Sequence, residues 1–387
     1  MNVVFLSPAF PPTARHFCRA LHERGVTVLG VGDEPYSAER AEFASLTEYV
    51  FEPNMAEYVA LRGAVTALAE RHGRIDRIDS NGEHWLEAEG RLRDDLHVFG
   101  LSSAEVTRHR SKLGMAETFG AAGIAHPPGI AATSALAVRA FAAEHGFPVI
   151  FKPDSGSGAV DTFTVADAAE LERTLARDLS KHLVQPFISG DIITYDGLTD
   201  REGNIVFSAS HVYDVGIMQL RQRRHDGYYY SLRVIPPELE ELGALAVSAF
   251  GLRERFFHLE FFARPDGSYV ALEMNLRPPG GFTTDMMNQA GNIDVYSLWA
   301  RALLGERLDA IAYDRKYHTA HAGRRRQRRY RLGHEELVRE LGASLVAIES
   351  IPAAFADTMG DTMYLLRHAE LTALQHAIEL VLATVDA

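Results

Sequence analysis

The sequence has a single cysteine, Cys18, among 387 residues, and it has no apolar run near the roughly 18 residues of a membrane span. One thiol cannot form an internal disulfide or a cysteine metal cluster, so Cys18 is expected to pack inside a helix. The N-terminus lacks a basic segment, and its apolar run from Val3 to Leu6 is too short for a secretory signal. These absences predict a cytoplasmic protein in a reducing compartment, without contact to a membrane.

Basic residues are also fewer than acidic ones. The sequence has 39 Lys and Arg and 52 Asp and Glu, which gives a formal net charge of −13. Such an excess of acid repels nucleic acid, which would then need a local basic patch. One candidate exists, the arginine cluster of Arg324, Arg325, Arg326, Arg328, Arg329 and Arg331. A lesser alternative is a nucleotide-gated protein that binds nucleic acid or an acidic partner through this cluster. A solvated basic face is favoured, since only Tyr330 supplies an aromatic ring.

The composition is that of a folded protein, with 47% hydrophobic and 24% charged residues, and the length predicts two to four domains. Two apolar runs, Val3 to Leu6 and Thr27 to Val31, flank a helical pattern and predict the start of a doubly wound α/β unit over residues 1–100. The loop between them lacks the glycines of a dinucleotide site. A separate small α/β lobe is expected from about residue 306.

A lysine and a glycine-rich loop form the first chemical motif. Lys152 ends an apolar strand, and the loop that follows contains Ser155, Gly156, Ser157 and Gly158. Such a loop can turn its N–H groups toward phosphate oxygens, while the lysine adds a positive charge. The pattern GxxxxGK[ST] is absent, so this is not a P-loop, and a flexible hairpin with a solvated lysine is an equal alternative.

Two glutamates form the second motif, on a predicted hairpin with its turn at residues 264–268. Glu260 and Glu273 lie almost equally far from that turn, so they can stand side by side on one face. Two adjacent carboxylates are costly unless a cation lies between them. Together with Asn275 they form an oxygen-only set that suits Mg²⁺ with nucleotide phosphates completing its shell. The alternative is that one glutamate points to solvent.

Arg277 follows two residues after Asn275 and precedes Pro278-Pro279-Gly280-Gly281. Its guanidinium can make a bidentate contact with a carboxylate or phosphate beside the metal, or it can form a structural ion pair. Three histidines are further candidates. His258 shares the face of Glu260 and could act as a general base, but packing in the core is favoured. A zinc site at His318 and His321 lacks nearby carboxylates and is not expected.

The ordered set of Lys112, Lys152 with its loop, the 185–191 segment, Glu260, Glu273, Asn275 and Arg277 resembles the ATP-grasp superfamily. Within it the chain looks like the carboxylate–amine ligases that join amino acids. The resemblance implies a pre-ATP-grasp α/β domain at 1–100, followed by a two-lobed α+β ATP-grasp domain. Its small lobe with the glycine-rich lid would span 101–188, its large lobe with the metal site 189–305, and a C-terminal lobe 306–387.

The resemblance also assigns roles. Lys112 and Lys152 would hold ATP phosphates, with Ser155 to Gly158 as a lid. Adenine would contact the backbone of Gln185, Pro186, Phe187 and Ile188. The ribose hydroxyls would bind Asp191, which replaces the glutamate usual in the family. Glu260, Glu273 and Asn275 would bind one or two Mg²⁺ ions, with Mn²⁺ as a possible substitute. Substrates would meet Arg277, Gly280 and Gly281, and an acidic group could meet Arg221 and Arg224.

The activity implied is an ADP-forming ligase. It would activate a small carboxylate as an acyl phosphate and transfer it to an amine, such as an amino acid. A carboxylase that uses bicarbonate and a ligase with a thiol acceptor are the closer alternatives. The sequence does not fix the oligomeric state, and a homodimer stays open.

Overall fold

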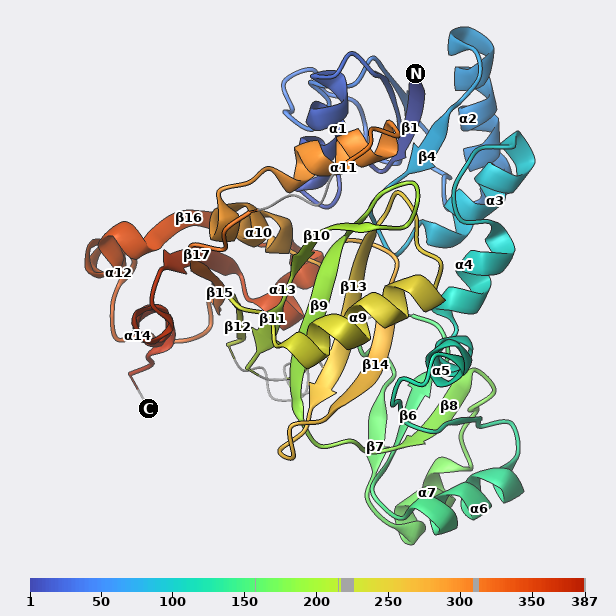
Figure 1. The fold of residues 1–387 in the computed structure, drawn as a ribbon, viewed down its shortest axis with the longest axis vertical. Helices are drawn as coiled ribbons and strands as arrows, with labels where there is room; N and C mark the ends of the chain where they lie inside the picture. Colours follow the sequence, from blue (N-terminus) through green and yellow to red (C-terminus); the bar gives the residue numbers. More distant parts are fainter. Residues whose placement is uncertain (157, 215, 217–225, 309–312, 386–387) are drawn as a thin grey trace.

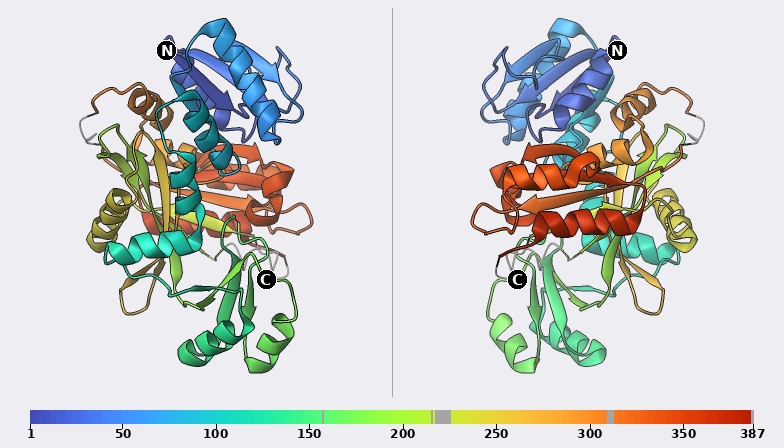
Figure 2. Two further views of the ribbon diagram at one scale, coloured as in Figure 1. Left: turned by 90° about the vertical axis from the view of Figure 1, so that its right-hand side faces the viewer. Right: turned by 90° about the vertical axis from the view of Figure 1, so that its left-hand side faces the viewer.

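The computed structural model describes residues 1–387 except 157, 215, 217–225, 309–312 and 386–387. Within the described residues the strands form three sheets (Figure 1). The N-terminal sheet lies at the top of that view, a large sheet in the middle and a small sheet at the bottom. Figure 2 shows that the C-terminal elements lie between the N-terminal sheet and the small sheet. The expected α/β class is confirmed.

The N-terminal sheet is parallel, in the order β3-β2-β1-β4. Its strands are β1 (Asn2–Leu6), β2 (Thr27–Gly32), β3 (Glu48–Phe51) and β4 (Arg77–Asp79), and its helices are α1 (Ala14–His22), α2 (Tyr58–His72) and α3 (Leu86–Leu96). Val4 and Leu6 pack toward α2, whereas Val3 and Phe5 pack toward α1. Burial on both faces explains why β1 is apolar throughout.

One helix that covers this sheet comes from far along the chain. Trp299 of α11 (Val295–Leu303) is fully buried against Phe5 and Phe17, with ring centroids 6.3 and 5.1 Å away. The N-terminal unit therefore completes its core with residues beyond 100, and the boundary predicted there does not separate two independent cores.

The small sheet is antiparallel, in the order β5-β8-β6-β7. Its segment contains α4 (Ser103–Arg110), α5 (Lys112–Ala121), β5 (Ile130–Ala131), α6 (Ala135–His145), β6 (Val149–Pro153), β7 (Phe163–Val165), α7 (Ala168–Thr174) and β8 (His182–Pro186). Val138 and Phe141 of α6 pack against Phe151 on one face of this sheet. Lys152 of β6 does not belong to this core, and its side chain lies in the region between the two lobes.

The large sheet has the order β14-β13-β9-β11-β12-β15-β17-β16, with β10 paired to β9. Its strands are β9 (Asp191–Thr199), β10 (Ile205–Ala209), β11 (His211–Tyr213), β12 (Tyr228–Ser231), β13 (Phe256–Ala263), β14 (Tyr269–Asn275), β15 (His318–Arg324), β16 (Leu345–Ser350) and β17 (Thr362–His368). Helix α9 (Pro237–Ala249) crosses one face of it (Figure 1).

The C-terminal segment has the expected α/β composition, but it has no separate sheet. Strand β15 pairs with β12, so residues beyond 306 extend the large sheet. The remaining elements are α10 (Thr283–Gly291), α12 (His334–Leu341), a 3₁₀ turn (Gly342–Ser344), α13 (Ala353–Met359) and α14 (Leu371–Leu382). Among the residues that the structure describes, none of the helices is long and apolar enough to cross a membrane.

Buried ion pairs join the N-terminal unit to the large sheet. Arg77 of β4 meets Glu254 at 2.8 Å, and Arg255 meets Glu89 at 3.2 Å and Asp79 at 3.5 Å. Breaking a buried pair leaves one charge without compensation, which is strongly destabilising. These contacts therefore fix the loop after β4 relative to the strands that carry the functional site.

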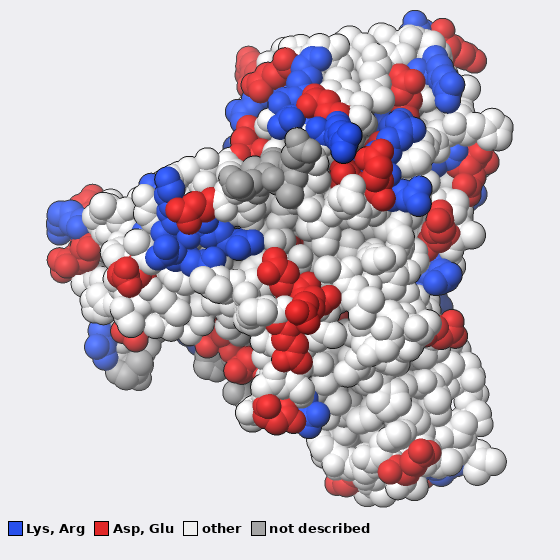
Figure 3. Space-filling model, in the orientation of Figure 1, with Lys and Arg blue, Asp and Glu red and all other residues white. Residues whose placement is uncertain are grey.

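The arginine cluster is mainly structural. Arg324 is buried and donates to the Val381 carbonyl at the end of α14 at 2.6 Å. Arg325 is buried as well, and Arg328 meets Asp226 at 3.0 Å. A cation at a helix C-terminus satisfies its last carbonyls, so the prediction of a solvated basic face is wrong for Arg324 and Arg325. Figure 3 shows acidic and basic side chains interspersed on the face in view.

A buried acid in α10 gives a prediction for stability. Tyr296 donates to Asp285 Oδ1 at 2.8 Å, and burial raises the pKa of Asp285 to about 6. Because this folded-state pKa exceeds that of the unfolded chain, which is about 4, ionisation destabilises the fold progressively as the pH rises from about 4 to 6. Asp285→Asn is expected to raise the free energy of unfolding at pH 7.5, by on the order of 1–2 kcal/mol, and to change it little at pH 3.

Calorimetric Tm values at both pH values test this, with Asp33→Asn at an exposed carboxylate as the control. A lower Tm for Asp285→Asn at pH 7.5 would show that the charge itself is stabilising and contradict the prediction.

Candidate functional site

A cavity of about 1290 Å³ lies between the small sheet and the large sheet. Strands β6, β8, β9, β11, β13 and β14 contribute to its walls, and so does α13 from the C-terminal segment. Sites for one small ligand usually measure about 300–1,000 Å³. This cavity therefore has room for a large ligand together with a smaller one.

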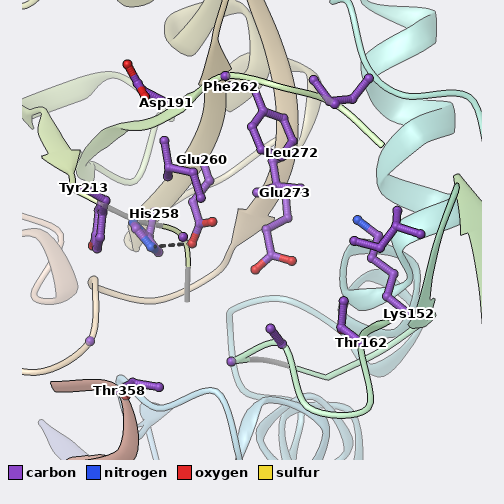
Figure 4. A pocket seen from close by; sticks show the side chains of 18 of the residues that line it. Lys152, Thr162, Asp191, Tyr213, His258, Glu260, Phe262, Leu272, Glu273 and Thr358 are labelled. Atoms are coloured by element: carbon purple, nitrogen blue, oxygen red, sulfur yellow. Dashed lines mark ion pairs between the residues drawn. The ribbon is translucent and has the colours of Figure 1, made fainter. Parts of the chain in front are cut away.

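The two glutamates of the hairpin stand directly opposite each other. Glu260 of β13 pairs with Glu273 of β14, and a bulge follows between Glu260 and Phe261. Because the bulge interrupts the alternation, both Leu272 and Glu273 face the cavity, as Figure 4 shows. The other faces of the two strands, with Leu259 and Met274, are buried in the core.

Two lysines lie across the cavity from these carboxylates. Lys152 is buried at the end of β6, and Lys112 begins α5. Burial lowers the pKa of Lys152 to about 8, with Lys112 acting in the same direction and Glu273 opposing it. Lys112 Nζ lies 3.8 Å from Glu273 Oε2 and donates to the Gly156 carbonyl at 3.1 Å. In this site, two ammonium groups therefore face two carboxylates.

The acidic side of the cavity fits a divalent cation. Asn275 donates through Nδ2 to Glu273 Oε1 at 3.1 Å, but it is buried and is not among the residues that line the cavity. Among the described residues no three His, Cys, Asp or Glu side chains are grouped around one metal position. A cation held here would need oxygen atoms from a bound ligand and water. That requirement matches Mg²⁺, which keeps several non-protein ligands.

A buried hydrogen-bonded chain supports Glu260 from behind. Asp196 of β9 accepts from His258 Nδ1 at 2.6 Å and from His211 Nδ1 at 2.7 Å. His258 Nε2 lies 3.0 Å from Glu260 Oε1. Burial lowers the pKa of His258, but Asp196 and Glu260 outweigh it and raise that pKa to about 9. His258 is buried, as the sequence favoured, and it is a cation between two carboxylates.

This contact gives a prediction. His258→Gln removes the hydrogen bond that orients Glu260 from Asp196, so the dissociation constant for Mg²⁺ is expected to rise at least 10-fold. His211 contacts Asp196 but not Glu260, so His211→Gln should shift that constant far less. Calorimetric Mg²⁺ titrations measure both variants. Equal shifts in the two would mean that Asp196, and not the orientation of Glu260, is responsible.

Arg277 follows β14 and lines the same cavity. Its Nε lies 3.3 Å from Glu83 Oε2, in the loop after β4, and its Nη1 donates to the Pro278 carbonyl at 2.9 Å. Glu83 also meets Arg110 at 3.0 Å. Gly280 and Gly281 line the cavity beyond Arg277. The guanidinium is thus held at the cavity wall by a partner from the N-terminal unit.

The other predicted residues are placed as follows. Ser155, Gly156 and Gly158 line the cavity, and so do Gln185, Pro186, Phe187, Ile188 and Asp191. Gln185 is buried, and its amide donates to the Pro127 carbonyl at 3.4 Å. Asp191 is exposed at the start of β9 (Figure 4). Ser157, Arg221 and Arg224 lie outside the described residues.

Several residues in or behind the cavity were not predicted. Asp196, which is buried behind Glu260, could have been found, because Thr194 and Asp196 are polar residues on one face of a central strand whose opposite face carries Ile193 and Tyr195. Leu272, Phe355, Thr358 and Met359 had no such signal. His318 and His321 are three residues apart on β15, so they face opposite sides of the sheet, which is consistent with the expectation of no zinc site. Cys18 is buried in α1, and burial raises its pKa.

Comparison with solved structures gives full-length matches. L-amino acid ligase from Bacillus licheniformis has a TM-score of 0.76 at 15% identity, covering 99% of this chain and 98% of that one. N5-carboxyaminoimidazole synthetase from Staphylococcus aureus has 0.75 at 11%, covering 98% and 97%. The biotin carboxylase domain of Hydrogenobacter thermophilus 2-oxoglutarate carboxylase, solved with MgADP and bicarbonate, has 0.73 at 18%, covering 95% and 86%. No family model matches the chain. At these identities the likeness establishes a shared fold.

Proposed function

We propose that this chain, which has the ATP-grasp fold, is an ATP- and Mg²⁺-dependent ligase. It would activate a carboxylate as an acyl phosphate and join it to an amine, releasing ADP and phosphate. The observation that carries this proposal is the pair Glu260 and Glu273, side by side in one cavity and opposed by Lys112 and Lys152.

The proposed roles follow from charge. Lys112 and Lys152 neutralise ATP phosphates, while Glu260, Glu273 and Asn275 hold Mg²⁺, or Mn²⁺ in its place. The bound cation would offset the charge of the triphosphate. The Ser155–Gly158 loop covers the phosphates, the Gln185–Ile188 strand offers its backbone to adenine, and Asp191 meets the ribose. A size of about 1290 Å³ is consistent with nucleotide and substrates bound together.

The reaction then has two steps. A carboxylate oxygen attacks the γ-phosphorus, the bond to the bridging oxygen breaks, and ADP leaves with the electron pair. The amine nitrogen attacks the acyl carbon, the carbon–oxygen bond to phosphate breaks, and the nitrogen loses a proton. Arg277 would hold the carboxylate beside the γ-phosphate, with Gly280 and Gly281 allowing close approach. Exclusion of water from the cavity by the bound substrates would limit hydrolysis of the acyl phosphate.

A carboxylase acting on bicarbonate would use the same phosphate and metal residues, and one similar structure holds MgADP and bicarbonate. The experiment that separates the functions is a phosphate-release screen of carboxylates and amines with ATP and Mg²⁺, followed by mass measurement of the product. We expect release that requires both substrates and an amide product. Release that needs bicarbonate alone, or a thiol acceptor, would favour the alternatives. A homodimer also stays a prediction, and one similar structure is of a domain dimer.

A further inference from the structure

Beyond the metal residues the cavity continues over a row of three rings. Tyr213 of β11 pairs with Tyr229 of β12, which pairs with His321 of β15, so all three stand on one face of the sheet. The Tyr213 and Tyr229 rings stack at 4.8 Å and 11°, and the Tyr229 and His321 rings at 5.1 Å and 16°. Each of them lines the cavity. These three residues are the aromatic floor.

Helix α13 forms a wall beside this floor. Ala354, Phe355, Thr358 and Met359 line the cavity, and their spacing places them on one face of the helix. In Figure 4 Thr358 and Tyr213 both lie on the left of the view, with Lys152 on the right. Met359 closes the far end against the glycine loop, since a Cβ on Gly281 would lie 2.2 Å from Met359 Cε. The positive φ of Gly281, 66°, also disfavours a side chain there.

The wall is held in place by β15 and its neighbours. Arg325 donates to the Ala356 carbonyl at 3.0 Å and to the Asp357 carbonyl at 2.8 Å, in the last turn of α13. His321 donates through Nε2 to the Met359 carbonyl at 3.2 Å. Phe355 also contacts Phe10 of the N-terminal unit, with ring centroids 5.2 Å apart. A wall fixed in this way loses little entropy when a ligand binds.

The residues of the floor and the wall that line the cavity carry no charge at pH 7. Burial lowers the pKa of His321 to about 4, so its imidazole is neutral at that pH. The Tyr229 hydroxyl already contacts Thr283 Oγ1 at 2.8 Å. Glu260, Glu273, Arg277 and the two lysines line the same cavity, so it offers charged groups and uncharged aromatic rings to its ligands.

We propose that the aromatic floor and α13 form the subsite for an aromatic side chain on one of the two substrates. This inference rests on the proposed ligase function and adds to it a substrate class, an amino acid with a ring-bearing side chain. Stacked rings and a thioether offer contacts that such a ring fills well. A small substrate such as alanine would leave the floor uncovered. The C-terminal segment, which supplies His321 and α13, would then determine specificity.

Equilibrium binding tests the subsite without requiring turnover. L-phenylalanine and L-alanine are titrated calorimetrically into the full-length protein with a non-hydrolysable ATP analogue and Mg²⁺. Phenylalanine carries both an amine and a carboxylate, so it probes either substrate position. We expect it to bind at least 10-fold more tightly than alanine.

Variants of the wall locate the effect. Met359→Ala and Phe355→Ala should each weaken phenylalanine binding at least 5-fold and change the affinity for alanine and for the ATP analogue less than 2-fold. Leu136→Ala, at an exposed residue of α6, is the control and should change none of them.

Equal affinity for the two amino acids, no binding of either, or equal loss in all variants would overturn the subsite. The phosphate-release screen decides the ligase function separately, because amide formation from other substrates would leave that function standing.

Discussion

Glu273→Gln is expected to lower Mg²⁺-dependent ATP turnover by on the order of 10³-fold, because one of the two paired carboxylates that would hold the cation loses its charge. The amide keeps the size of the side chain and can still contact Asn275. Lys112 and Lys152 would then face Glu260 alone. Steady-state release of phosphate over a range of Mg²⁺ concentrations measures the effect.

The matched control is Glu241→Gln, which neutralises an exposed carboxylate on α9 and should leave turnover unchanged. Glu260→Gln should resemble Glu273→Gln, since the two residues are paired across the hairpin. Circular dichroism and Tm establish that each variant is folded. If folded Glu273→Gln keeps more than a tenth of the turnover at every Mg²⁺ concentration, the metal site lies elsewhere.

Arg277→Ala is expected to raise the KM for the carboxylate substrate about 100-fold while changing the KM for ATP less than 3-fold. A guanidinium that binds a carboxylate through two N–H groups is not replaced by an ammonium, so Arg277→Lys should restore little of the loss. Initial-rate kinetics with each substrate varied in turn separate the two KM values.

A structural role for Arg277 would act through its ion pair with Glu83 at 3.3 Å. Glu83→Gln removes that pair and leaves the guanidinium in the cavity, so it distinguishes the two roles. We expect the KM for the carboxylate to stay within 3-fold of the parent value in Glu83→Gln. If Glu83→Gln raises this KM as much as Arg277→Ala does, Arg277 acts through its ion pair with Glu83 and not through contact with the substrate.

Local patterns predicted most of the elements around the site. The turn at residues 264–268 and the two apolar strands beside it predicted the hairpin, and equal distance from that turn brought Glu260 and Glu273 together. The sequence pattern of residues 371–382 predicts a helix, and α14 spans Leu371–Leu382. The pattern of residues 166–179 also predicts a helix, but α7 spans only Ala168–Thr174 and turns follow it.

Contacts between distant segments could not be predicted in this way. Nothing in residues 353–359 distinguishes α13 from any short helix, yet its position against β15 makes it a wall of the cavity. The arginine cluster was expected to be solvated, but Arg324 and Arg325 bond to carbonyls at the ends of α14 and α13. The number of arginines in the cluster does not predict which backbone carbonyls lie within hydrogen-bonding distance of their guanidinium groups.

The sequence by itself determined the α/β class and the hairpin that pairs Glu260 with Glu273, because strand periodicity and turn chemistry act over a few residues. Only the tertiary structure decided that Asp196 and His258 support Glu260, that Glu83 meets Arg277, and that the last 80 or so residues extend the large sheet. These contacts join segments far apart in the chain. Their geometry depends on how whole sheets and helices pack, and no local pattern records it.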